Sequence, residues 1–458
     1  MQKIYLRGYI YYNKRKYIFN FEEKKLVLIS IENEITFLER YQYIDYFEGH
    51  TLDGFDVVFH IKDKIYFKDG CYICFPRSIL VVKEDYLRIN ELNFDSIKIV
   101  GGNINRFYSN KKMIEYNKKE YKKNNINDFV FKNEEETKSE ETVCINETKT
   151  TFEFFIQHPR WKDDGCYNFG QFDSSVRIYY NNSVNYKKVI QDIAKIERLF
   201  QFCTNRNSIT FEKIFLEIQD NENKHKSVAE IIVPYMIEND VNKYMINYDT
   251  LSGHISNLIK ILNNSNYVLS IIPNDESEHN IITNKDYCAV FSCFQSINNY
   301  KNYENPDETK EDKYETSLNE IKDEILVFLK EKDQEYNGKD GRKRKYIKSF
   351  ISMINGSNLK LEKSITKELE KRLYLIDTLN YYEIKEKINS MGLQDATEHA
   401  VGIRDYITHN NIVKLDEVAI GMYQIITRLN YAIILEKAGI EKAKVEKIIR
   451  FLVQKNVI

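Results

Sequence analysis

The residues best suited to chemistry lie in the segment Gly402–Asn411, which reads Gly-Ile-Arg-Asp-Tyr-Ile-Thr-His-Asn-Asn. This segment places Arg404 and His409 five positions apart. Histidine as a residue type exchanges protons near neutral pH, and arginine keeps its charge and can donate two hydrogen bonds to one phosphate. Metal-free cleavage of RNA needs these two groups. A base takes the proton of the 2′-hydroxyl, and a cation stabilises the charge that develops on the phosphate.

The elements on either side of this pair are predicted helices, over 393–408 and 415–437. Along a straight helix, five residues turn about 500° and rise about 7.5 Å, so the two side chains would point about 140° apart. Two arrangements could still form one site. The polar run Thr408–Asn411 could end the helix and let the histidine leave its regular path. Alternatively, a second copy of the domain could complete the site across a two-fold axis.

The spacing alone is a weak signal. Chance would give about 0.3 arginine–histidine pairs at this interval in a chain of this composition. The simpler interpretation makes Arg404 a surface cation and His409 a residue that ends a helix near its negative dipole end.

Arg404-Asp405-x-x-x-His409, within a helical C-terminal region, resembles the signature of the HEPN superfamily. In that signature a polar residue follows the arginine and three more residues precede the histidine. The rest of the chain resembles the ApeA-type anti-phage defence proteins, in which a β-rich region precedes the HEPN domain. The segments that carry this wider resemblance are Leu6–Tyr9, the expected turn Phe47–Gly54 and the expected first HEPN helix Tyr287–Ser296.

This resemblance implies a metal-independent endoribonuclease without a cofactor, whose products are a 2′,3′-cyclic phosphate and a 5′-hydroxyl. His409 would act as general base or acid, Arg404 would stabilise the transition state, and Asp405 and Asn410 would orient or tune the pair. The resemblance also implies a homodimer formed through the HEPN domain and a role in anti-phage defence. The β-rich region would restrain the enzyme and could sense a phage-derived activator.

Glu398 and His399 lie one to two turns before Arg404 and could line the same site, although His399 would face elsewhere on a straight helix. Two other function classes remain open. A HEPN fold can serve as an RNA- or nucleotide-binding module that does not cleave. A metal-dependent enzyme has little support, because Asp163-Asp164 and Cys71-x-x-Cys74 are accompanied by no zincin, nucleophile-elbow or P-loop motif.

The basic cluster that ends Gly338-Lys-Asp-Gly-Arg-Lys-Arg-Lys345 is the densest in the chain and is expected in a glycine-bounded loop that leads into a helix. Its members could bind RNA phosphates, or they could form the solvated start of a helix. The residues concerned are Arg342, Lys343, Arg344 and Lys345. Because the formal net charge of the whole chain is −2, RNA contacts require such a local patch.

The chain has 458 residues, with 42% hydrophobic and 13% aromatic side chains, which predicts two or three folded domains. Seven scattered cysteines indicate a reducing compartment. We expect no signal peptide, because Met1–Gly8 lacks an apolar core, and no membrane span, because polar residues interrupt the run 419–435. The expected location is the cytoplasm. Cys71 and Cys74 are expected to be core cysteines near a strand, since no second pair accompanies them.

The predicted fold class is multidomain α+β: a β-rich N-terminal region of antiparallel sheets with a helix, followed by an all-α bundle. Residues 1–245 form the β-rich region, as a sandwich or a curled sheet. A charged stretch at 109–150 could split it in two, either as a solvated connection or as a basic nucleic-acid arm. A helical bridge over 246–285 and a HEPN-like helical domain over 286–458 complete the chain.

Overall fold

The computed structural model describes the greater part of the chain, and the following account is confined to that part. The described residues are 4–22, 24–31, 45–61, 65–68, 70–83, 88–109, 114–116, 129–131, 135–145, 148–157, 172–207, 209–222, 224–233, 245–264, 271–272, 282–298, 312–336, 341–356, 361–379, 381–409 and 412–453.

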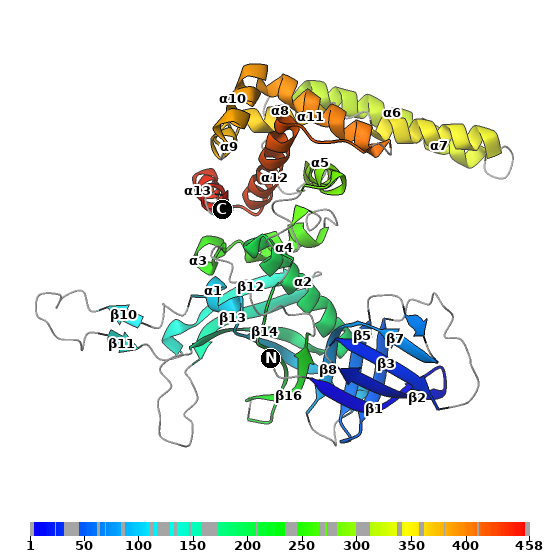
Figure 1. Cartoon of the computed structure of the whole chain (residues 1–458), viewed down its shortest axis with the longest axis vertical. Helices are drawn as coiled ribbons and strands as arrows, with labels where there is room; N and C mark the ends of the chain where they lie inside the picture. Colours follow the sequence, from blue (N-terminus) through cyan, green and yellow to red (C-terminus); the bar gives the residue numbers. More distant parts are fainter. Residues whose placement is uncertain are drawn as a thin grey trace, which may run out of the picture. The chain divides into compact units, whose positions relative to one another are not determined.

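The chain divides into two compact units. The first, here called the β unit, contains residues 1–281 and 434–456, and the second, here called the helical unit, contains residues 282–433. An antiparallel β-rich N-terminal region is followed by helices (Figure 1), which confirms the predicted α+β class.

The strands, in chain order, are β1 (Tyr5–Tyr12), β2 (Arg15–Glu22), β3 (Lys25–Ser30), β4 (Tyr46–Thr51), β5 (Asp56–Ile61), β6 (Tyr66–Lys68), β7 (Cys71–Cys74), β8 (Pro76–Val82), β9 (Phe94–Val100), β10 (Ile114–Tyr116), β11 (Phe129–Phe131), β12 (Ser139–Ile145), β13 (Thr148–Gln157), β14 (Asp173–Val184), β15 (Lys213–Gln219) and β16 (His225–Ile232). The helices of the β unit are α1 (Ile104–Phe107), α2 (Tyr186–Thr204), α3 (Tyr248–Leu251), α4 (Ile255–Asn264) and α13 (Lys442–Val453).

The helical unit is built from α5 (Asn284–Asn298), α6 (Asp312–Glu335), α7 (Gly341–Gly356), α8 (Leu361–Glu370), α9 (Tyr374–Asp377), α10 (Tyr382–Met391), α11 (Leu393–Thr408) and all but the last turn of α12 (Glu417–Lys437).

Fourteen of the described strands form one antiparallel sheet in the order β12-β13-β14-β9-β15-β16-β8-β5-β4-β1-β2-β3-β7-β6. Along β1, β2 and β3, buried and more exposed side chains alternate, as the two-residue period of a strand requires. The run β8-β5-β4-β1-β2-β3-β7 encloses one core, which includes Phe19, Phe47 and Phe59. Inward side chains of both end strands, β8 and β7, belong to this core. This part is therefore a curled sheet, which was one of the two predicted alternatives.

Two glycines allow β1 and β4 to approach closely. A Cβ on Gly8 would collide with the carbonyl oxygen of His50, and a Cβ on Gly49 would collide with that of Tyr9. The segment 47–54 was expected to be a turn, but the structure makes its first part strand β4, and the turn follows at Leu52–Gly54. Its glycine and polar residues are accommodated because β1 and β5 provide backbone partners on both sides.

Helix α2 packs against the sheet, with contacts to β5, β8, β14 and β16. The Asn185 side chain caps this helix by accepting a hydrogen bond from the N–H of Lys188, and Asn205 ends it in the left-handed conformation. Its buried stripe includes Val189, Ile193 and Ile196, as the predicted helical spacing requires.

The segment predicted to bridge the two halves contains α3 and α4, and both lie in the β unit. The backbone N–H of Gly253 donates to Glu141 Oε1 at 3.0 Å, and Ser256 Oγ accepts from the N–H of Cys144 at 3.0 Å. Helix α13, which the sequence placed within the helical domain, also lies in the β unit. The Ala438 carbonyl just before it accepts from Asn257 Nδ2 at 3.4 Å.

The core of the helical unit forms around α5, α11 and α12. Tyr287 on α5 donates from its hydroxyl to the Ala400 carbonyl at 3.0 Å, and Asn430 on α12 donates to the Val290 carbonyl at 2.9 Å. By length and composition α12 could cross a membrane, but most of its apolar window is buried inside the protein, as in a core helix.

Candidate active site around Arg404 and His409

Helix α11 positions the candidate pair, and its bounds match the predicted helix 393–408. Its C-cap is His409, whose φ of −85° and ψ of 25° depart from helical values. The backbone N–H of His409 donates to the Asp405 carbonyl at 3.3 Å, and the Thr408 hydroxyl donates to the same carbonyl at 2.7 Å. The helix therefore ends where the polar run begins, and the exposed His409 side chain lies off the regular helical path.

Neighbouring side chains hold the guanidinium of Arg404. Arg404 Nη1 lies 2.7 Å from Asp405 Oδ1, and Arg404 Nη2 donates weakly to Gln295 Oε1 at 3.5 Å. The Arg404 side chain is 24% exposed, and its Nε is buried with no hydrogen-bond partner among the described residues. The cation is thus partly buried, fixed in orientation and still reachable from solvent.

Helix α5 supports this arrangement. Gln295 and Cys288 are seven residues apart, the interval that returns to the same face of a helix. Cys288 Sγ lies 4.0 Å from the Arg404 carbonyl oxygen. Burial raises the pKa of the Cys288 thiol, Arg404 opposes that shift and Asp405 adds to it, so this thiol stays protonated at neutral pH. Gln295 was not among the predicted site residues, although its seven-residue spacing from Cys288 within the predicted helix was an available signal.

The structure does not bring the side chains of Arg404 and His409 into contact within the described part of one chain. This agrees with the angle of about 140° between positions five residues apart on a helix. Asn410, which was expected to tune the pair, lies outside the described residues. Asp405, the other residue expected to orient or tune the pair, contacts Arg404.

His399 belongs to a separate pair. Its Nε2 lies 2.7 Å from Asp416 Oδ2, and Asp416 Oδ1 accepts from the N–H of Ala419 at 2.8 Å in the first turn of α12. Burial alone would raise the pKa of Asp416, but hydrogen bonds from the Ala419 N–H and from His399 together lower it. Glu398 accepts a hydrogen bond from Gln394 at 3.0 Å, so neither suggested neighbour is in contact with Arg404.

The basic cluster lies at the start of α7, which begins at Gly341 and packs against α6. Arg344 Nε forms an ion pair with Asp333 Oδ1 at 3.0 Å, and Lys343 Nζ lies 5.0 Å from the centre of the Tyr336 ring. Lys345 is exposed, and the Arg342 side chain is outside the described set. Two of these cations therefore already have intramolecular partners.

Cys71 and Cys74 do not form a site together. They are three positions apart on strand β7, so their side chains point to opposite faces. Burial raises the pKa of Cys74 to about 12, as expected for a core cysteine. Within the part of the chain that the structure describes, no group of three or more histidine, cysteine, aspartate or glutamate side chains could hold a metal ion.

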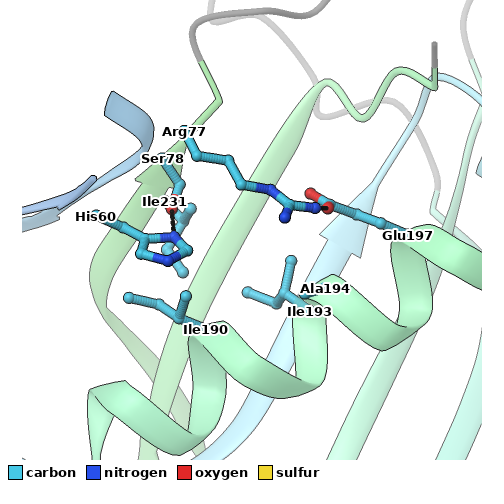
Figure 2. Close-up of a pocket in the computed structure, with 8 residues that line it drawn as sticks. All are labelled: His60, Arg77, Ser78, Ile190, Ile193, Ala194, Glu197 and Ile231. Atoms are coloured by element: carbon cyan, nitrogen blue, oxygen red, sulfur yellow. Dashed lines mark hydrogen bonds and ion pairs between the residues drawn. The ribbon is translucent and has the colours of Figure 1, made fainter. Parts of the chain in front are cut away.

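A small hollow in the β unit lies between strands β5, β8 and β16 and helix α2 (Figure 2). Its open space of about 10 Å³ has room for about one water molecule. Arg77 Nη2 forms an ion pair with Glu197 Oε2 at 2.5 Å across it, and His60 Nδ1 lies 3.4 Å from Ser78 Oγ (Figure 2). These contacts fasten α2 to the sheet and leave no room for an organic ligand.

In comparisons with known proteins, no family model, no curated protein and no solved structure matches this chain.

Proposed function

We propose that this protein is a metal-independent endoribonuclease of the HEPN type that cleaves cellular RNA. The observation that carries the proposal is the constrained Arg404 guanidinium five residues before an exposed histidine at the helix end. Such a cation can stabilise charge on a phosphate, and such a histidine can exchange a proton with the 2′-hydroxyl or the leaving oxygen.

The reaction assigned to this pair is attack of the 2′-oxygen on the adjacent phosphorus. The 2′-hydroxyl loses its proton to a base, the bond from phosphorus to the 5′-oxygen breaks, and the departing oxygen gains a proton. The products are a 2′,3′-cyclic phosphate and a 5′-hydroxyl. His409 is proposed as the base or the acid, and Arg404 as the group that binds the phosphate in the transition state.

The lack of contact between Arg404 and His409 within one chain supports a further part of the proposal. A homodimer formed through the helical unit would let the two motifs face each other across a two-fold axis. The proposed setting is the cytoplasm, and the proposed role is anti-phage defence. There the β unit would restrain the enzyme until a phage-derived activator binds. Light scattering on the purified protein, with and without RNA, tests the dimer.

The same lack of contact favours a second candidate function, a HEPN module that binds RNA or a nucleotide without cleaving it. Such a module needs the Arg404 cation but no proton transfer by His409. The two candidates therefore differ in what replacement of the histidine does.

The test compares wild type with Arg404→Ala and His409→Ala on total RNA in excess EDTA. His399→Ala serves as a matched control, because this histidine lies on the same helix but pairs with Asp416. The enzyme proposal expects chelator-resistant cutting that leaves cyclic phosphates, that is lost in both site variants and that persists in the control. Cutting that survives both substitutions contradicts the assigned residues. RNA binding without cutting, weakened by Arg404→Ala alone, supports the binding module.

A further inference from the structure

Several outward side chains of strands β1, β2 and β3 are exposed. Their inward side chains, such as Ile10, Phe19 and Leu28, are fully buried in the core of the curled sheet. Their outward side chains are exposed although many are aromatic or aliphatic: 56% for Tyr11, 44% for Tyr5, and 43% for both Ile18 and Ile29. No helix is drawn over β1 and β2 (Figure 1).

The neighbouring part of the same face shows what a covered surface looks like in this protein. On β4 and β5, the outward Tyr46 and His60 stack against each other, and the Tyr186 ring at the start of α2 packs edge-on against Tyr46. Tyr186 also donates its hydroxyl to Glu48. Helix α2 thus provides partners for the outward residues of β4 and β5. Among the described residues, no helix provides such partners for the outward side chains of β1–β3, which are exposed.

The strand register arranges the outward side chains of β1, β2 and β3 in rows. Tyr9, Ile18 and Ile29 are cross-strand partners in one row, and Tyr11 is paired with Lys16 in the next. Neighbouring strands lie about 4.8 Å apart, and side chains two residues apart on one strand lie about 6.8 Å apart. The result is an open array of rings and aliphatic side chains on the outside of the curled sheet, here called the tyrosine face.

Cations lie against the rings of this face. Lys16 Nζ lies 3.9 Å from the centre of the Tyr9 ring and 5.7 Å from that of Tyr11, and the Arg7 guanidinium carbon lies 4.6 Å from the centre of the Tyr5 ring. Residues 4–31 contain six lysines and arginines but two glutamates, a local net charge of +4 in a chain whose formal net charge is −2. The local charge favours a polyanion.

We propose that the tyrosine face binds a single-stranded nucleic acid. Exposed rings provide surfaces on which bases stack, and cations beside the rings provide partners for the phosphates that link those bases. A duplex would hide its bases from the rings. An acidic protein would use the cations but would have little need for the exposed rings of Tyr5 and Tyr11. Rings and cations contact bases and phosphates, which RNA and DNA share, so the inference concerns the single strand and not its sugar. It does not depend on cleavage by the helical unit.

The test measures, by fluorescence anisotropy, how tightly the full chain binds labelled 12-nucleotide oligo(dT) and oligo(U). Every protein tested carries His409→Ala, so that oligo(U) stays intact, and the protein with this substitution alone is the parent. Tyr11→Ala and Lys16→Gln should each weaken binding of the single strands by at least about five-fold. Tyr11→Phe, which keeps the ring, should bind as tightly as the parent. Tyr382→Ala, which removes a 74%-exposed ring from the helical unit, should have no effect. Lys16→Gln should also lower the slope of log affinity against log salt by about one.

The inference is overturned if neither oligonucleotide binds, or if Tyr11→Ala and Lys16→Gln bind as tightly as the parent. A 12-base-pair duplex that binds as tightly as the single strands, with no loss on Tyr11→Ala, also overturns it, because attraction to phosphates alone would explain that result. Equal melting temperatures for parent and variants ensure that a loss of binding is not a loss of fold. Failure of the ribonuclease assay would leave these outcomes unaffected, since oligo(dT) is not a ribonuclease substrate.

Discussion

Arg404 Nη1 lies 2.7 Å from Asp405 Oδ1, so the arginine proposed to bind the phosphate is ion-paired with the next residue in the chain. A phosphate that approaches Arg404 must share this cation with Asp405 or displace it. The Asp405 side chain is 54% exposed, so water screens the pair, and such exposed pairs contribute less than about 1 kcal/mol.

Asp405→Asn should therefore lower the KM for RNA by up to about five-fold, because it removes a negative charge beside the phosphate position but keeps a hydrogen-bond acceptor for Arg404. Asp405→Ala removes the acceptor as well and should lower kcat. Steady-state cleavage of a short RNA gives both constants. A rise in KM for Asp405→Asn would show that Asp405 assists binding and does not compete with it.

Gln295→Ala should lower kcat/KM by about two- to ten-fold, because it removes the acceptor near Arg404 Nη2 while the ion pair with Asp405 remains. Gln295→Glu keeps an acceptor for Arg404 but adds a negative charge beside the phosphate position, so it should retain kcat and raise the KM for RNA. Gln394→Ala is the matched control, since that glutamine contacts Glu398 and not Arg404. Equal rates for Gln295→Ala and the control would mean that Gln295 does not position the arginine.

Asp192→Ala should lower the free energy of unfolding by about 3 kcal/mol or more, since a buried ion pair would lose one partner. The fully buried Asp192 carboxylate lies 2.8 Å from Lys188 Nζ and 3.1 Å from Lys195 Nζ. It also accepts from the Tyr180 hydroxyl, whose pKa is raised first by burial and then by this carboxylate. Urea denaturation measures the loss. Glu222→Ala, which breaks a surface pair with Lys224, should cost less than about 1 kcal/mol.

The contribution of Asp416 to stability should depend on pH. Its pKa is lower in the folded chain than the usual value of about 3.9 for an unfolded one. The ionised carboxylate therefore stabilises the fold fully above the unfolded value, and this stabilisation is lost as the pH falls through the folded value. The melting temperatures of wild type and Asp416→Asn should differ near pH 5 and converge below about pH 4. A difference that does not narrow in acid would contradict this assignment.

Gly8→Ala should destabilise the β unit by about 1–3 kcal/mol, because the added methyl group meets the His50 carbonyl across the β1–β4 pair. Gly402→Ala is the matched control, since its added Cβ meets nothing within 4 Å and lies in α11. It should stabilise the protein by about 0.5–1 kcal/mol. Thermal melting of both variants compares them, and equal stabilities would show that β1 can move away from β4 at little cost.

The helices and strands that the sequence predicted correctly are those in which apolar and polar side chains alternate with a regular period. Helix α11 has the predicted bounds, and β1 coincides with the strand that the β-branched and aromatic residues of Tyr5–Tyr12 predict. Strand β4 was expected to be part of a turn, because Gly49 and His50 interrupt its apolar pattern and only the partner strands β1 and β5 define it. Strand β9 was not predicted, and it pairs with β14 and β15, which come much later in the chain.

The candidate site was predictable in its residue types and not in its contacts. Arg404, Asp405 and His409 are adjacent in sequence, so a local motif identifies them. Gln295 approaches Arg404 only because α5 packs against α11, and His399 is separated from the pair because Asp416 at the start of α12 binds it. Such partners depend on long-range packing, which one sequence without its relatives does not specify.

The location of α13 in the β unit makes the helical unit an insertion with two attachment points. The chain leaves the β unit near residue 281 and returns to it near residue 434, and Lys444 Nζ then lies 3.4 Å from the Asp249 carbonyl oxygen. A fragment that starts at residue 282 and runs to the C-terminus would therefore carry a helix whose apolar side, with Val445 and Ile449, has lost its packing partners. A fragment that ends at residue 281 would lack part of its own core. A single proteolytic cut near residue 281 would leave the helical unit covalently joined to the β unit only through α13, and a cut near residue 434 would leave it joined only through residue 281.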